Sequence, residues 1–352
     1  MKKHFLSIFL FFVFLSSQSF SESITFQDDD HIGWSCGSLS MYCLPQQEID
    51  NHFNLVSENV LERWDTLIGN QIFSLYSPGR DNDSLTKEFN ELNNLRLSLW
   101  IKDYDQFPCE SNPFFKLSQE LLLNNKFRQV NCISFEHSLT DPSYNSSCIQ
   151  IKKRRFFALE GPMDNNVSCF FKLLSNWNVS SLVRLTDDID HKTGKSKCFP
   201  YWTDLVFEKN SQTFLQIPVK AQYETPVSKW GRLVVPYFVW PDWDDHKGVN
   251  SEKLVNFINQ ARNNNTSEDD IIAVHCSAGV GRTGTFIACL CLLDEIDEQL
   301  EKGLLPENLQ LSIARLFLHL NFYRPWLVST PSQYITLYRT VEWYLNYKKG
   351  DK

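Results

Sequence analysis

The chain has 352 residues, of which 42% are hydrophobic and 14% aromatic, so it can fill one large hydrophobic core or two small ones. Its net charge is −8 at pH 7, and about −10 without the two lysines that follow the first methionine. A charge of this sign argues against general binding to nucleic acid or to an anionic membrane surface, and we expect no nucleic-acid partner.

Residues 1–21 are typical of a secretory signal peptide. A basic start is followed by an apolar run over 5–15 and then by small residues, with candidate cleavage sites after Ser19 and Ser21. The run is shorter than the roughly 20 apolar residues that cross a bilayer. We therefore expect a secreted or periplasmic mature chain without an integral membrane segment; an N-terminal strand or anchor helix is the alternative.

Residues 22–83 show no strong period, and we treat them as an N-terminal extension of unclear structure. Cys36 and Cys43 lie close together in this segment, and an exported protein can bridge them or leave them unpaired. Most of the ten cysteines lie instead in apolar stretches, which predicts that they are buried. No pair has the spacing of zinc ligands, so we expect no metal site.

Residues 84–349 show helical patterns that alternate with short β-branched and aromatic runs, as in an α/β domain. The expected strands cover 182–185, 205–207, 214–219 and 271–274, and the expected helices include 170–174, 255–261, 286–293 and 313–322.

The stretch "IIAVHCSAGVGRTGTF" over 271–286 places Cys276 six positions before Arg282. This spacing alone is weak evidence, because Cys148 and Arg154 share it on a β-like run with no glycine between them. Around Cys276, by contrast, an apolar strand leads into a glycine-rich turn and then into an apolar helix. The context, and not the spacing, indicates a site for chemistry.

The glycines of this stretch allow the backbone to curl with its amide groups facing inward, at the positive end of the following helix. Such a loop binds phosphate, and Arg282 adds a planar fork that can hold two phosphate oxygens. The residues expected to bind phosphate through the main chain are Ser277, Ala278, Gly279, Val280 and Gly281.

The same positive field favours the thiolate of Cys276 over its thiol, and a thiolate is the nucleophilic form. We expect His275 and the hydroxyl of Thr283, or that of Ser277, to form hydrogen bonds around the sulfur. For His275, a fully bonded core histidine is the alternative.

"HCSAGVGRTG" resembles the signature loop of the protein tyrosine phosphatases, and the similarity extends over about 127–343. The resemblance implies a protein tyrosine phosphatase-like fold, with a central twisted mixed sheet flanked by helices and the loop between a strand and a helix. It also implies a catalytic domain over 84–349, phosphotyrosine-containing protein substrates, a cysteinyl-phosphate intermediate and no cofactor. Because no lysine lies between Cys276 and Arg282, the loop is more similar to the phosphotyrosine branch than to the phosphoinositide branch.

"YFVWPDW" is similar to the family's mobile loop that carries the proton donor, and the resemblance assigns that role to Asp242. The sequence then departs from the family, because residues 243–245 are inserted. Asp244 or Asp245 can therefore compete with Asp242 for the role.

"RQVNCISFEHS" is similar to the family's substrate-recognition segment and places Gln129 where the family has a tyrosine that stacks on the substrate. Loss of that ring removes stacking worth about 0.5–1.5 kcal/mol, unless Phe127 replaces it. In "KSKCFPYW", Lys197 matches a family lysine and is expected near the acid loop.

"RPWLVSTPSQY" is similar to the segment that positions the hydrolytic water. Ser329 stands at its first glutamine and Gln333 at its second, so the resemblance assigns the water to Gln333 or Ser329 and implies slow hydrolysis of the intermediate. Arg324 matches a family arginine, and Asn321 replaces another.

These features predict an exported protein-tyrosine-phosphatase. The asparagine-rich composition together with the signal suggests a secreted bacterial factor that acts on proteins of a host cell. A phosphate-dependent binding protein with slow turnover, and a phosphatase for phosphoinositides or other phosphate esters, are the alternatives.

Overall fold

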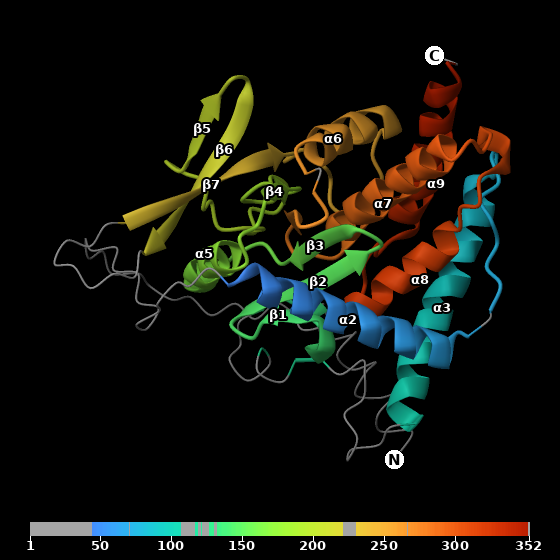
Figure 1. Cartoon of the computed structure of the whole chain (residues 1–352), viewed down its shortest axis with the longest axis horizontal. Coiled ribbons are helices and arrows are strands. Elements are labelled where there is room, and N and C mark those ends of the chain that lie inside the picture. Colours follow the sequence, from blue (N-terminus) through green and yellow to red (C-terminus); the bar gives the residue numbers. More distant parts are fainter. Residues whose placement is uncertain are drawn as a thin grey trace.

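The computed structural model describes residues 44–69, 71–106, 117–118, 121, 127–129, 132–220, 230–265 and 267–350. These residues form a mixed eight-stranded sheet with helices packed around it (Figure 1), which confirms the predicted α/β fold. The strands are β1 (Leu139–Asp141), β2 (Tyr144–Ile151), β3 (Arg154–Leu159), β4 (Ser181–Arg184), β5 (Val206–Lys209), β6 (Gln212–Lys220), β7 (Trp230–Val239) and β8 (Ile271–His275). The helices are α2 (Gln46–Leu67), α3 (Asn82–Gln106), α5 (Val167–Asn176), α6 (Ser251–Asn263), α7 (Gly281–Glu301), α8 (Ile313–Tyr323) and α9 (Pro331–Lys349).

The strand order is β1-β2-β3-β8-β4-β7-β6-β5. The four central strands β3, β8, β4 and β7 are parallel, and the pairs on either side of them are antiparallel. Leu159 and Arg184 both lie opposite His275, so three strands end at the same level. In parallel sheets ligands bind beyond the carboxyl ends of the strands, and here β8 occupies the middle of that edge.

Strand β8 is buried along its whole length, as expected for an apolar strand that is covered on both faces. Five residues separate β8 from helix α7, which packs along β3 and β8, while α9 packs against α3, α6 and α7 (Figure 1). The segment between β8 and α7 therefore joins two of the most buried elements of the molecule.

Helix α2 was not predicted, since we saw no strong period in 22–83. Its buried residues nevertheless recur every three or four positions, which is the spacing of one helix face; they are Ile49, Phe53, Val56, Val60, Trp64 and Leu67. The helix lies across β2 and reaches α8, and its apolar face belongs to the same core as the sheet (Figure 1). Residues 46–67 thus share the core of the domain predicted over 84–349.

The expected strands and helices all overlap elements of the structure, and the seven cysteines that it describes are buried as predicted. Cys148 and Arg154 lie on the neighbouring strands β2 and β3, so their shared spacing with the Cys276 loop is coincidental. The predicted signal peptide and the possible Cys36–Cys43 disulfide lie outside the described residues. Across the described ranges, no helix has the length and apolarity that crossing a membrane requires.

Candidate active site

The carboxyl ends of the central strands converge on one loop. The Ser277 carbonyl accepts from the amide of Gly161, just after β3, at 2.8 Å, and the Leu185 amide after β4 donates to the His275 carbonyl at 2.9 Å. The amide of Trp240, at the end of β7, donates to the Arg184 carbonyl at 2.8 Å. Segments that are far apart in the sequence are therefore fixed around residues 276–282.

In this cysteine loop (276–282), the carbonyl groups of residues 276–281 all accept hydrogen bonds. The acceptors and their donors are Cys276 O with His275 Nδ1 (3.0 Å), Ala278 O and Gly279 O with Arg324 (3.3 and 3.0 Å), Val280 O with the Gly284 amide (2.8 Å) and Gly281 O with Thr285 Oγ1 (2.9 Å). In a trans peptide the N–H points opposite to the C=O, and the chain has no cis peptide bond among its described residues. The amides of 277–282 therefore turn away from these donors, into the hollow of the loop, where an anion can accept from them.

Two glycines of the loop are required by its contacts. Gly279 has φ +72°, and a Cβ there would lie 2.1 Å from the Leu159 carbonyl oxygen. A Cβ on Gly281 would lie 2.6 Å from Ser329 Oγ and 2.8 Å from Gln333 Nε2. The loop therefore rests directly on the end of β3 on one side and on the start of α9 on the other.

Arg324 is the main support of the loop and is completely buried. Besides the two loop carbonyls, its guanidinium donates to the Cys132 carbonyl at 3.1 Å and to Ser147 Oγ at 3.2 Å. It also donates to Asn145 Oδ1 at 3.2 Å and to Ser134 Oγ. Burial lowers the pKa of Arg324 below its ordinary value, but its partners are all acceptors, as a charged guanidinium requires.

Arg282 lies at the start of α7 with only 1% of its surface exposed. Its Nη1 donates to the Trp243 carbonyl at 3.0 Å, and Nη2 lies 3.2 Å from Asp245 Oδ1 in an ion pair. The ion pair does not meet hydrogen-bond geometry, so within the described residues Nε and Nη2 have no hydrogen-bond acceptor. A buried guanidinium with two nitrogens that lack a hydrogen-bond acceptor is a site for an anion.

His275 has both ring nitrogens bonded. Nδ1 lies 3.0 Å from the Cys276 carbonyl, which can only accept, so Nδ1 carries the proton and Nε2 accepts from Tyr201 Oη at 2.6 Å. Burial lowers the pKa of His275 to about 3, so the ring is neutral near pH 7. His275 is bonded to the carbonyl oxygen of Cys276 and not to its sulfur, and its hydrogen bonds are those of a fully satisfied core histidine.

Three polar side chains line the loop from the helix side. Thr283 Oγ1 is buried and has no hydrogen-bond partner in the described part of the chain, so it is free to donate to an anion. Gln333 Oε1 accepts from the amide of Ser329 at 3.0 Å and from its hydroxyl at 3.2 Å. Gln333 Nε2 is buried without an acceptor among the described residues and lies beside Gly281. The predicted water-positioning pair therefore contacts the cysteine loop.

The acid loop (Trp240–Lys247), which we call the flap, carries three aspartates that differ in their exposure and in their partners. Asp242 is exposed, and its carboxylate has no hydrogen bond or ion pair with another described residue. Asp244 is exposed and pairs with Lys247 at 2.7 Å, whereas Asp245 is the one in contact with Arg282. The structure thus brings Asp245, and not Asp242, to the arginine.

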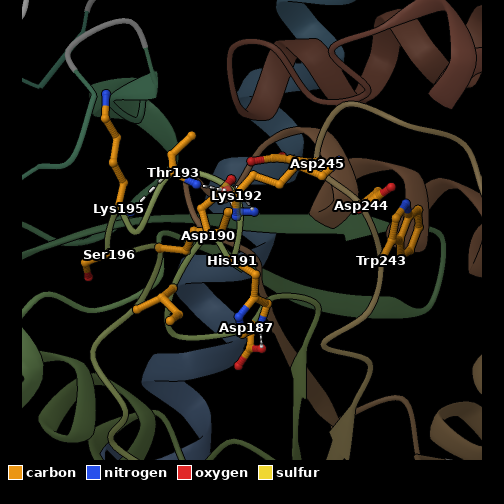
Figure 2. A network of polar contacts seen from close by, with 12 residues as sticks. Asp187, Asp190, His191, Lys192, Thr193, Lys195, Ser196, Trp243, Asp244 and Asp245 are labelled. Carbon is orange, nitrogen blue, oxygen red and sulfur yellow. Dashed lines mark hydrogen bonds and ion pairs between the residues drawn. The ribbon is translucent and has the colours of Figure 1, made fainter.

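The flap lies beside the loop that carries residues 187–196, as Figure 2 shows. In this view Asp245 points toward Lys192, and Asp244 points away. Lys197 lies 3.1 Å from Asp190 Oδ2 and also acts electrostatically on Asp244, so it does lie near the flap. Gln129 is exposed, and its amide oxygen accepts from Cys132 Sγ at 3.4 Å within its own segment. Phe127 is half-buried.

Glu160 was not identified as a site residue from the sequence, although it follows a buried strand and precedes Gly161. Its buried carboxylate accepts from the Arg128 amide at 2.8 and 2.9 Å and from Asn145 Nδ2 at 2.9 Å. Burial raises the pKa of Glu160 to about 7. It joins the recognition segment to the strand end on which the loop rests. Among the described residues, no group of three His, Cys, Asp or Glu side chains is placed to hold a metal ion.

Comparisons with known proteins agree with this arrangement. Residues 123–343 match the family model described as protein-tyrosine phosphatase. The chain is 31% identical over 217 residues to receptor-type tyrosine-protein phosphatase eta of Gallus gallus, covering 57% of this chain and 14% of that protein. It is 27% identical over 265 residues to the putative receptor-type tyrosine-protein phosphatase mosPTP-1 of Aedes aegypti, covering 66% of this chain and 19% of that protein. The chain thus spans less than a fifth of the length of these relatives.

Among solved structures, the fold is similar to that of PTPN18 in complex with HER2 phosphopeptides. The two superimpose with a TM-score of 0.57 at 19% identity, over 82% of this chain and 99% of the other. At this level of identity the likeness concerns the fold.

Proposed function

Because this chain belongs to the protein-tyrosine phosphatase family, we propose that it hydrolyses phosphotyrosine esters of proteins through a cysteinyl-phosphate intermediate. The observation that supports this most directly is the cysteine loop, in which a buried thiol lies among inward-facing amides. Next to it is a buried arginine with two nitrogens that lack a hydrogen-bond acceptor. These groups are arranged to hold the three outer oxygens of a phosphoryl group.

In the first step the Cys276 thiolate attacks phosphorus, an S–P bond forms and the P–O bond to the tyrosine oxygen breaks. The loop amides and Arg282 stabilise the negative charge on the phosphoryl oxygens. The leaving oxygen takes a proton, and we assign its donor to Asp242, which has to move from its exposed position as the flap closes.

In the second step the ionised Asp242 accepts a proton from water, the water oxygen bonds to phosphorus, and the S–P bond breaks to release phosphate and the thiolate. Gln333 supports this step because its unbonded Nε2 lies beside the loop, whereas Ser329 holds its other end. A serine reaches less far than the glutamine of the family pattern, so we expect hydrolysis of the intermediate to be slow.

The test is hydrolysis of p-nitrophenyl phosphate by the wild type and by Cys276→Ser. Removing a nucleophile of this kind lowers turnover by at least about 10⁴-fold. Absence of wild-type turnover between pH 5 and 7 would favour the second candidate, a phosphate-dependent binding protein; the exposed Asp242 and the serine at position 329 are the features that favour it.

Substrate class needs a separate comparison, because the exposed Gln129 offers no ring to stack on phosphotyrosine. We expect a phosphotyrosine peptide to be hydrolysed faster than a phosphoserine peptide or a phosphoinositide head group. A preference for the head group would identify the chain as a phosphatase of phosphoinositides.

Export is a further part of the proposal. The features of residues 1–21 support a cleaved signal, and a secreted bacterial factor would meet phosphotyrosine proteins in a host cell. N-terminal sequencing of the mature protein should find a start after Ser19 or Ser21. A mature chain that retains residues 5–15 would contradict export by this route.

A further inference from the structure

The flap carries a carboxylate that contacts the arginine expected to bind the substrate's anion. Asp245 Oδ1 is 3.2 Å from Arg282 Nη2, and Arg282 is otherwise the buried guanidinium whose Nε and Nη2 have no hydrogen-bond acceptor in the described part of the chain. A carboxylate and a phosphoryl group use the same planar fork of an arginine. A phosphoryl group that binds Nη2 therefore competes with Asp245 for it.

The position of Asp245 is set by the flap around it. The Trp243 carbonyl accepts from Arg282 Nη1 at 3.0 Å, and Trp243 Nε1 donates to the Lys247 carbonyl at 3.0 Å. Two hydroxyls at the start of α9, those of Thr330 and Ser332, donate to the His246 carbonyl at 3.0 and 2.8 Å.

His246 itself has φ +59°, so the chain turns sharply immediately after Asp245. Because bonded residues lie on both sides of Asp245, its contact with Arg282 is part of a folded turn.

From this geometry we infer that Asp245 competes with the substrate for Arg282. Its carboxylate contacts the arginine when no substrate is bound, and it has to leave before a phosphate ester can bind. The inference rests on the proposed function, because it concerns the same anion site. It assigns Asp245 a role distinct from proton donation. The side chain of Asp245 is 38% exposed, so water can solvate it when it is displaced.

Competition of this kind predicts how much the affinity changes for anions of different charge. If Asp245 holds the arginine for most of the time, every anion binds with an affinity reduced by the same factor, the fraction of time that the site is open. Direct repulsion by a nearby charge would act differently, because a dianion would be affected about twice as strongly in free energy as a monoanion. Ligands of different charge therefore separate the two explanations.

The experiment measures the binding of tungstate, a dianion, and of p-nitrophenyl sulfate, a monoanion, to full-length wild type and to Asp245→Asn at one pH and one ionic strength. The variant should bind both about three- to tenfold more tightly, by a similar factor, as expected for loss of a partly exposed ion pair. The matched control is Asp244→Asn, which removes the same charge from the same flap, because Asp244 pairs with Lys247 and not with Arg282. This variant should change neither affinity by more than about twofold.

A second measurement uses the thiol itself. Iodoacetate carries a carboxylate that the open arginine attracts, whereas iodoacetamide is neutral. The ratio of the alkylation rates of Cys276 by the two reagents should rise in Asp245→Asn and stay at the wild-type value in Asp244→Asn.

Unchanged or weaker binding in Asp245→Asn, or equal behaviour of the two variants, would overturn the inference. A loss of kcat in Asp245→Asn with unchanged anion binding would also overturn it and make Asp245 the proton donor. Tighter anion binding together with no turnover of p-nitrophenyl phosphate by the wild type would leave the inference standing and refute the proposed function.

Discussion

The cysteine loop and the flap face each other but are built in opposite ways. In the loop, the carbonyls accept hydrogen bonds from their surroundings, and the side chain of Arg324 donates to two of them. In the flap, Asp242 and Asp244 are exposed, and the inserted turn is held by a few contacts to Arg282 and to the start of α9.

The difference shows which part of the site is fixed before substrate arrives. A loop whose amides must all point at one anion needs a rigid support, because each amide that turned away would lose its bond to the anion. A group that delivers a proton and then excludes water has to move, so its segment cannot be held as firmly. We therefore expect substitutions in the flap to lower turnover, and substitutions that affect the support of the loop to lower stability and anion binding together.

The largest effect in the flap should come from Asp242→Asn. Loss of a proton donor lowers kcat by about 10²- to 10⁴-fold and leaves KM nearly unchanged, because binding uses the loop and Arg282. Steady-state kinetics with p-nitrophenyl phosphate give both constants, and Asp244→Asn is the control from the same flap. A fall in kcat for Asp244→Asn as deep as that for Asp242→Asn would remove the distinction between these two aspartates.

In the loop, Arg324→Met should damage the fold and the anion site together. The substitution leaves buried carbonyls of Ala278 and Gly279 without donors, which costs about 1–3 kcal/mol for each group, so the free energy of unfolding should fall by about 3 kcal/mol. Urea unfolding measures this, and tungstate should bind more weakly in the same variant. Arg315→Met serves as the control, because Arg315 is an exposed arginine on α8, the helix that ends immediately before Arg324.

A smaller effect should appear in the pH dependence of stability. Because burial raises the pKa of Glu160 from 4.5 to about 7, its contribution to stability is fully present below pH 4.5 and is lost as the pH rises through about 7. The loss amounts to about 3 to 4 kcal/mol at most, since one pKa unit corresponds to about 1.4 kcal/mol. Glu160→Gln has no such titration.

The readout is the difference in unfolding free energy between wild type and Glu160→Gln at pH 5 and pH 8. The wild type should lose stability relative to the variant between these values. The low pKa of His275 acts in the opposite direction but is common to both proteins, so it cancels. A difference that is the same at both pH values would show that Glu160 is already ionised at pH 5.

Local sequence was enough to predict the cysteine loop, because Cys276, its glycines and Arg282 follow one another within a few positions, between an apolar strand and an apolar helix. The same holds for β8 and α7, whose apolar residues are contiguous. Helix α2 was within reach as well, since Phe53, Val56 and Val60 follow its helical spacing.

The sequence did not supply the long-range contacts of Arg324 and Glu160. Arg324 supports carbonyls more than forty positions away, and Glu160 holds the amide of Arg128. The sequence left three aspartates in the flap as candidates for one role; only the folded turn, held by Thr330 and Ser332, places Asp245 on Arg282 and leaves Asp242 exposed. Short-range spacing determines the type of chemistry that a segment can perform, whereas the pairing of charges depends on how the strand ends meet.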